Sequence, residues 1–99
     1  MEELKALIDF YSAIQNDNRI GPTHISLYLA LFYFYVLNHF QNPVLITRAG
    51  VMHRAKICGL ATYHKCIKDL SDFGYISYKP SYNPMVGSTV HLVRQLKIE

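Results

Sequence analysis

The chain has 99 residues, of which 51% are hydrophobic and 13% are aromatic. This length suits one folded domain with one core and excludes two, and the apolar content excludes a disordered polar tail. Residues 1–43 carry four carboxylates and two basic side chains, whereas residues 44–99 carry three carboxylates and eight basic side chains. The C-terminal part is therefore the part suited to a polyanionic partner.

The N-terminus and the cysteines indicate the cellular compartment. Glu2 and Glu3 stand where a secretory signal peptide would need basic residues. Cys58 and Cys66 are most simply free thiols of a reducing compartment, so we expect a cytoplasmic protein. The most hydrophobic run, residues 25–37, is shorter than the roughly 20 residues that cross a bilayer, and three tyrosines interrupt it. It predicts a buried helix.

Two helices are expected in residues 1–43. Apolar residues at spacings of three and four predict the first over about residues 2–15. After a turn over residues 16–21, the second runs to about His39, with either Pro22 in its first turn or Thr23 as its N-cap. This second helix is apolar on nearly its whole circumference, so it must be covered on all sides.

Two arrangements could cover the second helix. In the preferred one, residues 1–43 pair with a second copy of the chain, giving a homodimer. In the alternative, the second helix is the central helix of a monomer, with the first helix and the C-terminal hairpin on opposite faces. The residues expected in the dimer interface are Leu4, Ile8, Tyr11, Leu31, Phe34 and Tyr35.

Residues 44–93 predict a helix-turn-helix followed by a hairpin. Residues 44–46 read as a short strand, Thr47 as the N-cap of a helix over 48–55, and residues 56–59 as a turn that uses Gly59. A further helix over 60–73 ends at Gly74. Alternating residues predict strands over 75–79 and 88–93, joined by a loop with two prolines. The fold class expected is therefore α+β.

The helix over residues 60–73 has two chemically different faces. Tyr63, Ile67 and Leu70 recur at spacings of four and three and predict a face packed into the core. The opposite face offers hydrogen-bond donors and acceptors for base edges, a small alanine for close approach, and lysines for phosphate. The start of the preceding helix suits a phosphate as well. These candidate DNA contacts are Thr47, Arg48, Ala61, Thr62, His64, Lys65 and Lys68.

Residues 44–93 resemble the winged helix-turn-helix family. The resemblance rests on Ala61-Thr-Tyr-His-Lys-Cys-Ile-Lys-Asp-Leu70 and on Gly74-Tyr-Ile-Ser-Tyr-Lys-Pro-Ser-Tyr-Asn-Pro84, and it is closest to small helix-turn-helix proteins of bacterial mobile elements and phages. It implies four helices with a two- or three-stranded β-wing, and a recognition helix in the major groove of duplex DNA. It also implies that the wing, residues 79–88, lies on the flanking backbone through Lys79, Ser81, Tyr82 and Asn83.

The resemblance further implies a transcriptional regulator, or an accessory factor in the replication or excision of a mobile element. A homodimer would present two recognition helices about one DNA turn apart. The chain departs from many relatives at Gly59, where they have a serine or threonine N-cap, and at Leu60, where an arginine is common. Lys65 thus becomes the principal candidate for a base contact.

Three other functions are alternatives to DNA binding for this sequence. Cys58, His64 and Cys66 match no common zinc-finger spacing, and two helix positions separated by two residues point about 200° apart, so neither metal nor cofactor is expected. No phosphate loop, nucleophile elbow or metalloprotease pair is present, so no enzymatic activity is expected. The remaining rival is a winged-helix module for protein–protein contacts, with the second helix as its docking surface.

Overall fold

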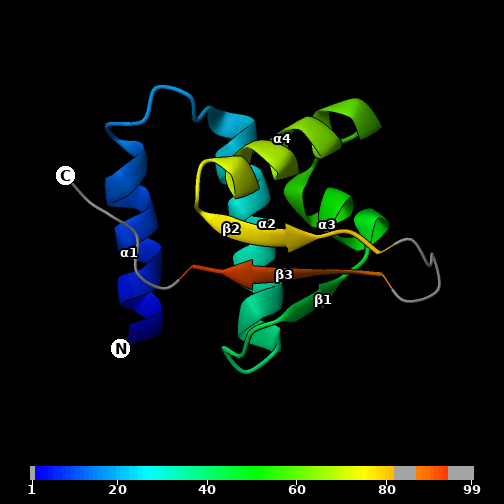
Figure 1. Cartoon of the computed structure of the whole chain (residues 1–99), viewed down its shortest axis with the longest axis horizontal. Helices are drawn as coiled ribbons and strands as arrows, with labels where there is room; N and C mark the ends of the chain where they lie inside the picture. Colours follow the sequence, from blue (N-terminus) through cyan, green and yellow to red (C-terminus); the bar gives the residue numbers. More distant parts are fainter. Residues whose placement is uncertain (1, 82–86, 94–99) are drawn as a thin grey trace.

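The computed structural model describes residues 2–81 and 87–93. Within them the chain is α+β, with four helices and a three-stranded antiparallel sheet (Figure 1). This confirms the expected number of helices and the short strand before the third helix. The elements in chain order are α1 (Glu2–Ile14), α2 (Pro22–Leu37), β1 (Val44–Ile46), α3 (Arg48–Ala55), α4 (Leu60–Asp72), β2 (Ile76–Lys79) and β3 (Ser88–Leu92).

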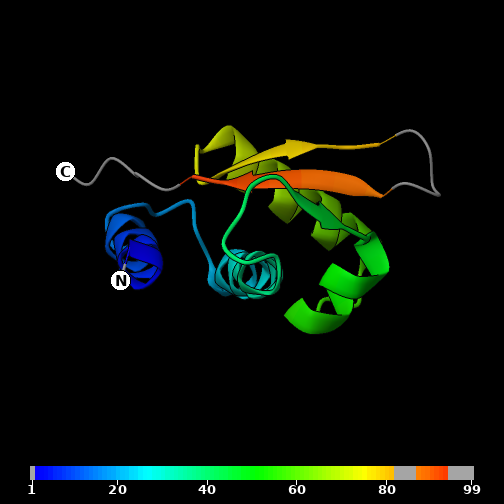
Figure 2. The ribbon, with the colours of Figure 1, turned by 90° about the horizontal axis from the view of Figure 1, so that it is seen from below.

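The sheet has the order β1-β3-β2, so the last strand lies between the other two. Val90 of β3 pairs with Val44 of β1 on one side and with Tyr78 of β2 on the other. Strand β1, which precedes α3 and α4, is thereby joined to the β2–β3 hairpin that follows them. Viewed from below, the sheet lies over a layer that contains α1, α2 and α3 (Figure 2).

A side chain extends the pairing of β1 with β3 beyond the backbone. Nδ2 of Asn42 donates to the Leu92 carbonyl at 3.0 Å, and Oδ1 of Asn42 accepts from the Leu92 N–H at 3.0 Å. The Asn42–Pro43 peptide bond is cis. The asparagine amide thus satisfies both backbone groups of Leu92 at the position where β1 has not yet begun.

Helix α2 is the central helix of the core. Leu27, Tyr28 and Leu31 on one of its faces are each 0% exposed, and the helix packs against α3, α4, β1 and β3. Helix α1 joins the core through Phe10, whose ring stacks on that of Tyr28 with centroids 3.6 Å apart. The monomeric alternative expected the first helix and the hairpin to cover this helix, but here α3 and α4 cover it as well.

Two residues expected in a dimer interface are therefore core residues. Leu31 and Tyr35 are buried inside the monomer, so they present no surface to a second copy. Phe34 is half-buried beside Gly50 of α3. The apolar pattern did not distinguish these positions, because a helix that is apolar all round gives no direction for its core face.

Helix α2 starts in one of the two expected ways, with Pro22 in its first turn, but it ends earlier than expected. The helix begins at Pro22 with Gly21 as N-cap, and the Gly21 N–H donates to Nδ1 of His24 at 3.0 Å. It ends at Leu37 instead of about His39, because His39 has a φ of 58° and so has left the helical conformation. Among the described residues, no helix is both long enough and apolar enough to cross a membrane.

A polar cluster joins the α1–α2 turn to the start of β2. The Asp17 carboxylate accepts from Nε of Arg19 at 2.8 Å and from the Tyr75 hydroxyl at 2.7 Å. The Arg19 guanidinium lies over the Phe73 ring, 3.9 Å from its centroid. The hydrogen bond from Arg19, together with that from Tyr75, holds the pKa of Asp17 well below its usual range, although burial opposes this shift.

Candidate nucleic-acid interface

Helix α3 begins at the N-cap that the sequence predicted. Oγ1 of Thr47 accepts a hydrogen bond from the Gly50 N–H at 3.2 Å, and Thr47 has the extended backbone typical of an N-cap. Arg48 follows as the first helical residue, and both side chains are exposed. The start of α3 therefore presents a guanidinium next to the positive end of the helix dipole.

The turn between α3 and α4 is fixed from both sides. Lys56 adopts a left-handed conformation, with a φ of 60°, and ends α3. The Ile57 N–H then returns to the Met52 carbonyl at 3.0 Å, and the hydroxyl of Ser26 on α2 donates to the Ala55 carbonyl. These bonds satisfy carbonyls at the end of α3 and tie the turn to the core.

Helix α4 has the two faces expected from its sequence. Tyr63, Ile67 and Leu70 are buried, as is Cys66. At its N-terminus, Gly59 supplies no side-chain cap, as its identity predicted. On the opposite face, every residue expected to contact DNA is exposed: Ala61, Thr62, His64, Lys65 and Lys68.

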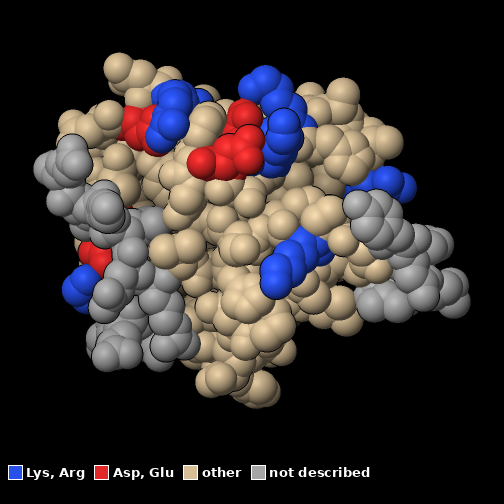
Figure 3. All heavy atoms as spheres, in the orientation of Figure 1, with Lys and Arg blue, Asp and Glu red and all other residues tan. Residues whose placement is uncertain are grey.

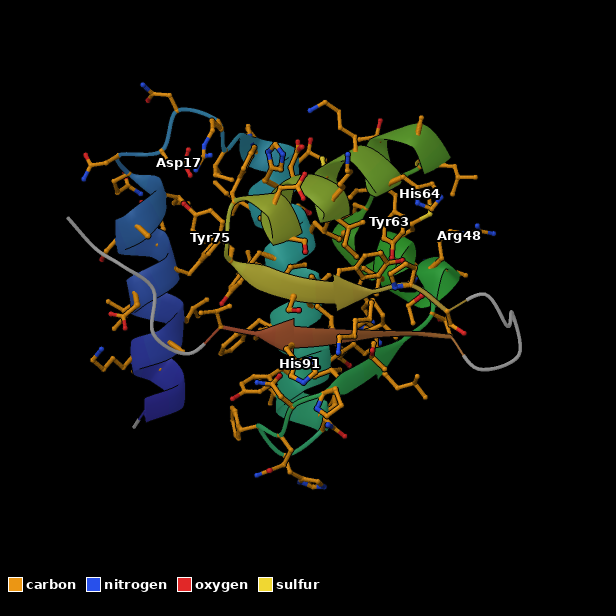
Figure 4. The ribbon with its side chains drawn as sticks, viewed as in Figure 1. Asp17, Arg48, Tyr63, His64, Tyr75 and His91 are labelled. Carbon is orange, nitrogen blue, oxygen red and sulfur yellow. The ribbon has the colours of Figure 1, made fainter. Side chains whose placement is uncertain are left out.

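Figure 4 shows Tyr63 and His64 of α4 together with Arg48 of α3. In this view Arg48 and His64 lie on the same side of Tyr63, and the Tyr63 and His64 rings contact edge to face with centroids 5.4 Å apart. Burial raises the pKa of Tyr63 to about 12, with a contribution from Tyr78 that the positive charge of Arg48 partly offsets. Arg48 at the start of α3 is thus close enough to Tyr63 of α4 to influence its pKa.

Asp69 and Lys65 of α4 form an ion pair. Nζ of Lys65 lies 2.9 Å from Oδ2 of Asp69, and Nε2 of His24 lies 2.9 Å from the same oxygen. Because Nδ1 of His24 accepts the Gly21 N–H, Nε2 carries the proton and donates it to Asp69. The hydrogen bond from His24, followed by that from Lys65, keeps the pKa of Asp69 below its usual range.

This pairing changes the electrostatics expected of α4. The helix carries Lys65 and Lys68 and also two aspartates, Asp69 and Asp72, so its formal charges cancel. Figure 3 shows acidic atoms directly beside basic ones on this part of the surface. The excess of positive charge near the interface therefore comes from other elements, namely from Arg48 of α3 and Lys79 of β2.

A groove of about 460 Å³ runs between α4 and β2. Ile67 and Tyr78 supply its apolar and aromatic lining, and the Tyr78 N–H donates to Oγ of Ser71 at 3.3 Å. Two of the predicted DNA contacts line this groove, which separates the α4 surface from the strand. Its lining residues are His64, Ile67, Lys68, Ser71, Asp72, Tyr78 and Pro80.

The described part of the wing contributes less to this surface than α4 does. Lys79 is exposed and follows Tyr78, so the two side chains point to opposite faces of the sheet. Ser81 is half-buried, and its N–H donates to Oγ of Ser88 at 3.3 Å. Tyr82 and Asn83, the other two expected wing contacts, lie outside the described residues.

Sequence reasoning missed His24 as a part of this site. Its ring is buried where α2 meets α4, and it reaches Asp69 across 45 residues of sequence. The available signal was local: a histidine three residues after Gly21 can accept the N-cap N–H, as it does here. Nothing local, however, predicted that its second nitrogen would orient a carboxylate on α4.

The thiols and histidines of this region lie apart. Cys66 is buried and burial raises the pKa of its thiol, whereas His64 is exposed on the other side of α4 and Cys58 is exposed in the turn. Within the described residues, no group of three histidine, cysteine, aspartate or glutamate side chains is placed to hold a metal ion.

Comparison with known proteins gave no relatives. The chain matches no family model, no curated protein and no solved structure.

Proposed function

We propose that this protein binds duplex DNA as a single winged helix-turn-helix domain, with α4 in the major groove. The observation that supports this proposal is the outer face of α4, where all five predicted contact residues are exposed, as are Thr47 and Arg48 at the start of α3. The chain order α2-β1-α3-α4-β2-β3 and the sheet order β1-β3-β2 support the winged-helix description. The role in the bacterial cytoplasm is transcriptional regulation, or an accessory step in the replication or excision of a mobile element.

Residues in the first turns of α4 make the base contacts in this proposal. Ala61 has a methyl side chain, which lets the helix approach the groove floor and contact a thymine methyl. Thr62 and His64 offer donors and acceptors to base edges, and Lys65 offers a donor to guanine. All four side chains are exposed, so base contact requires no repacking of the core.

The cations at the margins of this surface make the phosphate contacts. Arg48 lies at the start of α3, where the helix dipole also favours an anion. Lys68 lies one turn beyond Lys65 on α4, and Lys79 lies on β2. Because Asp69 and Asp72 cancel the lysine charges of α4, nonspecific attraction should be modest, and base contacts should supply a larger share of the affinity.

The test measures retention on random duplex DNA as a function of salt. Lys65→Ala and Lys68→Ala should each weaken retention at low salt, and loss of a phosphate contact should reduce the salt slope by about one. Lys5→Ala is the matched control, because Lys5 lies on α1, away from α4 (Figure 1), and is also an exposed lysine paired with an aspartate. The control should bind as the wild type does.

Two results would contradict the proposal. If neither α4 lysine affects retention, α4 is not the DNA contact. If the chain binds a protein with little salt dependence and does not bind DNA, the rival protein-interaction function is correct. If neither result is found, selection of bound fragments from random and genomic DNA would identify the target sequence.

A further inference from the structure

Two apolar stripes remain uncovered on the described surface. On α1, the stripe consists of Leu4, Ile8 and Tyr11, at spacings of four and three. On α2, it consists of Leu29, Tyr33, Val36 and Leu37. Each of these seven side chains is between 38% and 63% exposed, which is unusual for large apolar residues that recur along one helix face.

Both stripes point away from the core. On α1 the core is contacted by Phe10, which stacks on Tyr28, so the helix face with Ile8 and Tyr11 is turned outward. On α2, Leu29 and Tyr33 lie opposite the buried face formed by Leu27, Leu31 and Tyr35, given the 100° rotation per residue.

The α2 stripe begins beside a shallow apolar depression. A groove of about 380 Å³ lies at the start of α2, lined by Ile20, Pro22, Ile25 and Leu29, with Gly21 and Ser26. The residues on α1 have the i, i+4, i+7 spacing of a helix that packs into an apolar groove. Each chain therefore carries two uncovered apolar helix faces, one on α1 and one on α2.

We propose that α1 of one copy packs along the α2 stripe of a second copy, and reciprocally, in a two-fold symmetric dimer. Such an interface is self-complementary, because each copy supplies one α1 face and one α2 face. It replaces the expected interface residues Leu31 and Tyr35, which are buried, with Leu29, Tyr33, Val36 and Leu37. The inference does not depend on DNA binding.

The available area and charge fit a second copy as the occupant. Large side chains of this kind expose on the order of 200 Å² when fully accessible, so seven that are about half exposed supply roughly 700 Å². This approaches the roughly 800 Å² that each partner contributes to a stable interface. Helix α2 carries no Asp, Glu, Lys or Arg, and Lys5 of α1 is already paired with Asp9. The nearest cation of α3, Arg54, lies over the Tyr33 ring, 4.5 Å from its centroid, and so borders the α2 stripe.

The experiment measures the mass of the full chain by light scattering at about 100 µM. The wild type should have twice the chain mass of 11.4 kDa. Ile8→Lys and Leu29→Glu should each be monomeric, since each places two uncompensated charges in the interface. Leu45→Glu is the matched control: Leu45 is an exposed apolar residue on β1, outside both stripes, and its variant should remain dimeric.

A mixture of the two monomeric variants tests the reciprocal geometry. When Ile8→Lys and Leu29→Glu are mixed in equal amounts, one half of the interface pairs Lys with Glu and the other half is wild type, so a dimer should reappear. A monomeric wild type would overturn the proposal, as would variants that remain dimeric. A mixture that stays monomeric would also overturn it, because pairing of α1 with α1 and of α2 with α2 would give that result. Circular dichroism shows whether each variant is folded.

Discussion

The ammonium of Lys65 lies 2.9 Å from the carboxylate of Asp69, on the helix proposed to enter the major groove. This carboxylate cannot simply follow the lysine outward, because the buried His24 ring holds the same oxygen. Lys65 must therefore leave Asp69 to contact DNA. The pair is an intramolecular competitor for the principal candidate base contact.

Asp69→Asn should strengthen duplex binding at low salt by about two- to fivefold, since the variant no longer competes for an exposed lysine. It should also restore a positive formal charge to α4. The measurement is a binding isotherm on random duplex DNA at several salt concentrations.

Asp69→Asn could strengthen binding by releasing Lys65 or by making α4 more positive, and Asp72→Asn separates these two causes. It removes the same charge from α4, but within the described residues Asp72 makes no ion pair. Its effect should be smaller than that of Asp69→Asn in the wild-type background. In the Lys65→Ala background the two changes should have equal effects, because no lysine remains to be released. Equal effects in both backgrounds would mean that the pair does not restrain Lys65.

The Asp17 cluster should make stability depend on pH in the acid range. The folded-state pKa of Asp17 lies below its ordinary value of 3.8, so its contribution is fully present above that value and is lost as pH falls below it. Asp17→Asn should lower the free energy of unfolding at pH 7 by about 1–3 kcal/mol. The difference from the wild type should shrink between about pH 4 and pH 2 in urea titrations.

Tyr75→Phe is the partial counterpart of Asp17→Asn in this cluster. It removes the hydroxyl that donates to Asp17 but leaves the Arg19 pair in place. Its pH dependence should therefore lie between those of the wild type and Asp17→Asn. In the wild type, burial and then the bond to Asp17 raise the pKa of Tyr75 to about 12, so its hydroxyl remains a donor throughout this range.

Gly87→Ala should destabilise the sheet more than Gly74→Ala does. Both glycines have positive φ values, 78° and 89°, so either alanine is strained by about 1 kcal/mol. A Cβ on Gly87 would also lie 2.7 Å from the Ile46 carbonyl oxygen, whereas one on Gly74 would meet nothing within 4 Å. An additional loss of about 1–2 kcal/mol is expected for Gly87→Ala. Equal losses in urea unfolding would show that β1 moves aside freely.

Asn42→Ala should destabilise the chain by about 1–3 kcal/mol, because the part-buried N–H and carbonyl of Leu92 both lose their partner. Asn42→Asp keeps an acceptor for the N–H but places a carboxylate against the carbonyl. It should therefore be destabilising at pH 7 and less so at a pH that protonates the new carboxyl. Urea unfolding at the two pH values measures this difference.

Local patterns in the sequence predicted the elements that carry the proposed interface. Thr47 identified the start of α3 because an N-cap contacts a backbone N–H only three residues away. The spacing of Tyr63, Ile67 and Leu70 identified the buried face of α4 because it follows the helical period. Each of these signals involves residues within two turns of one another.

The contacts that fix those elements in space join distant residues. His24 reaches Asp69 across 45 positions, Asn42 reaches Leu92 across 50, and Asp17 reaches Tyr75 across 58. No periodicity relates such residues, since they meet only after the chain has packed around α2.

The sequence by itself determined the order of the helices and strands and the exposed face of α4, because helix period and capping are local properties of the backbone. Only the tertiary structure decided which side of α2 is covered. An all-apolar helix can turn any face inward, and packing against α1, α3, α4 and the sheet selects one. Tertiary packing likewise decided the charge of the proposed interface, by bringing His24 to the carboxylate that holds Lys65.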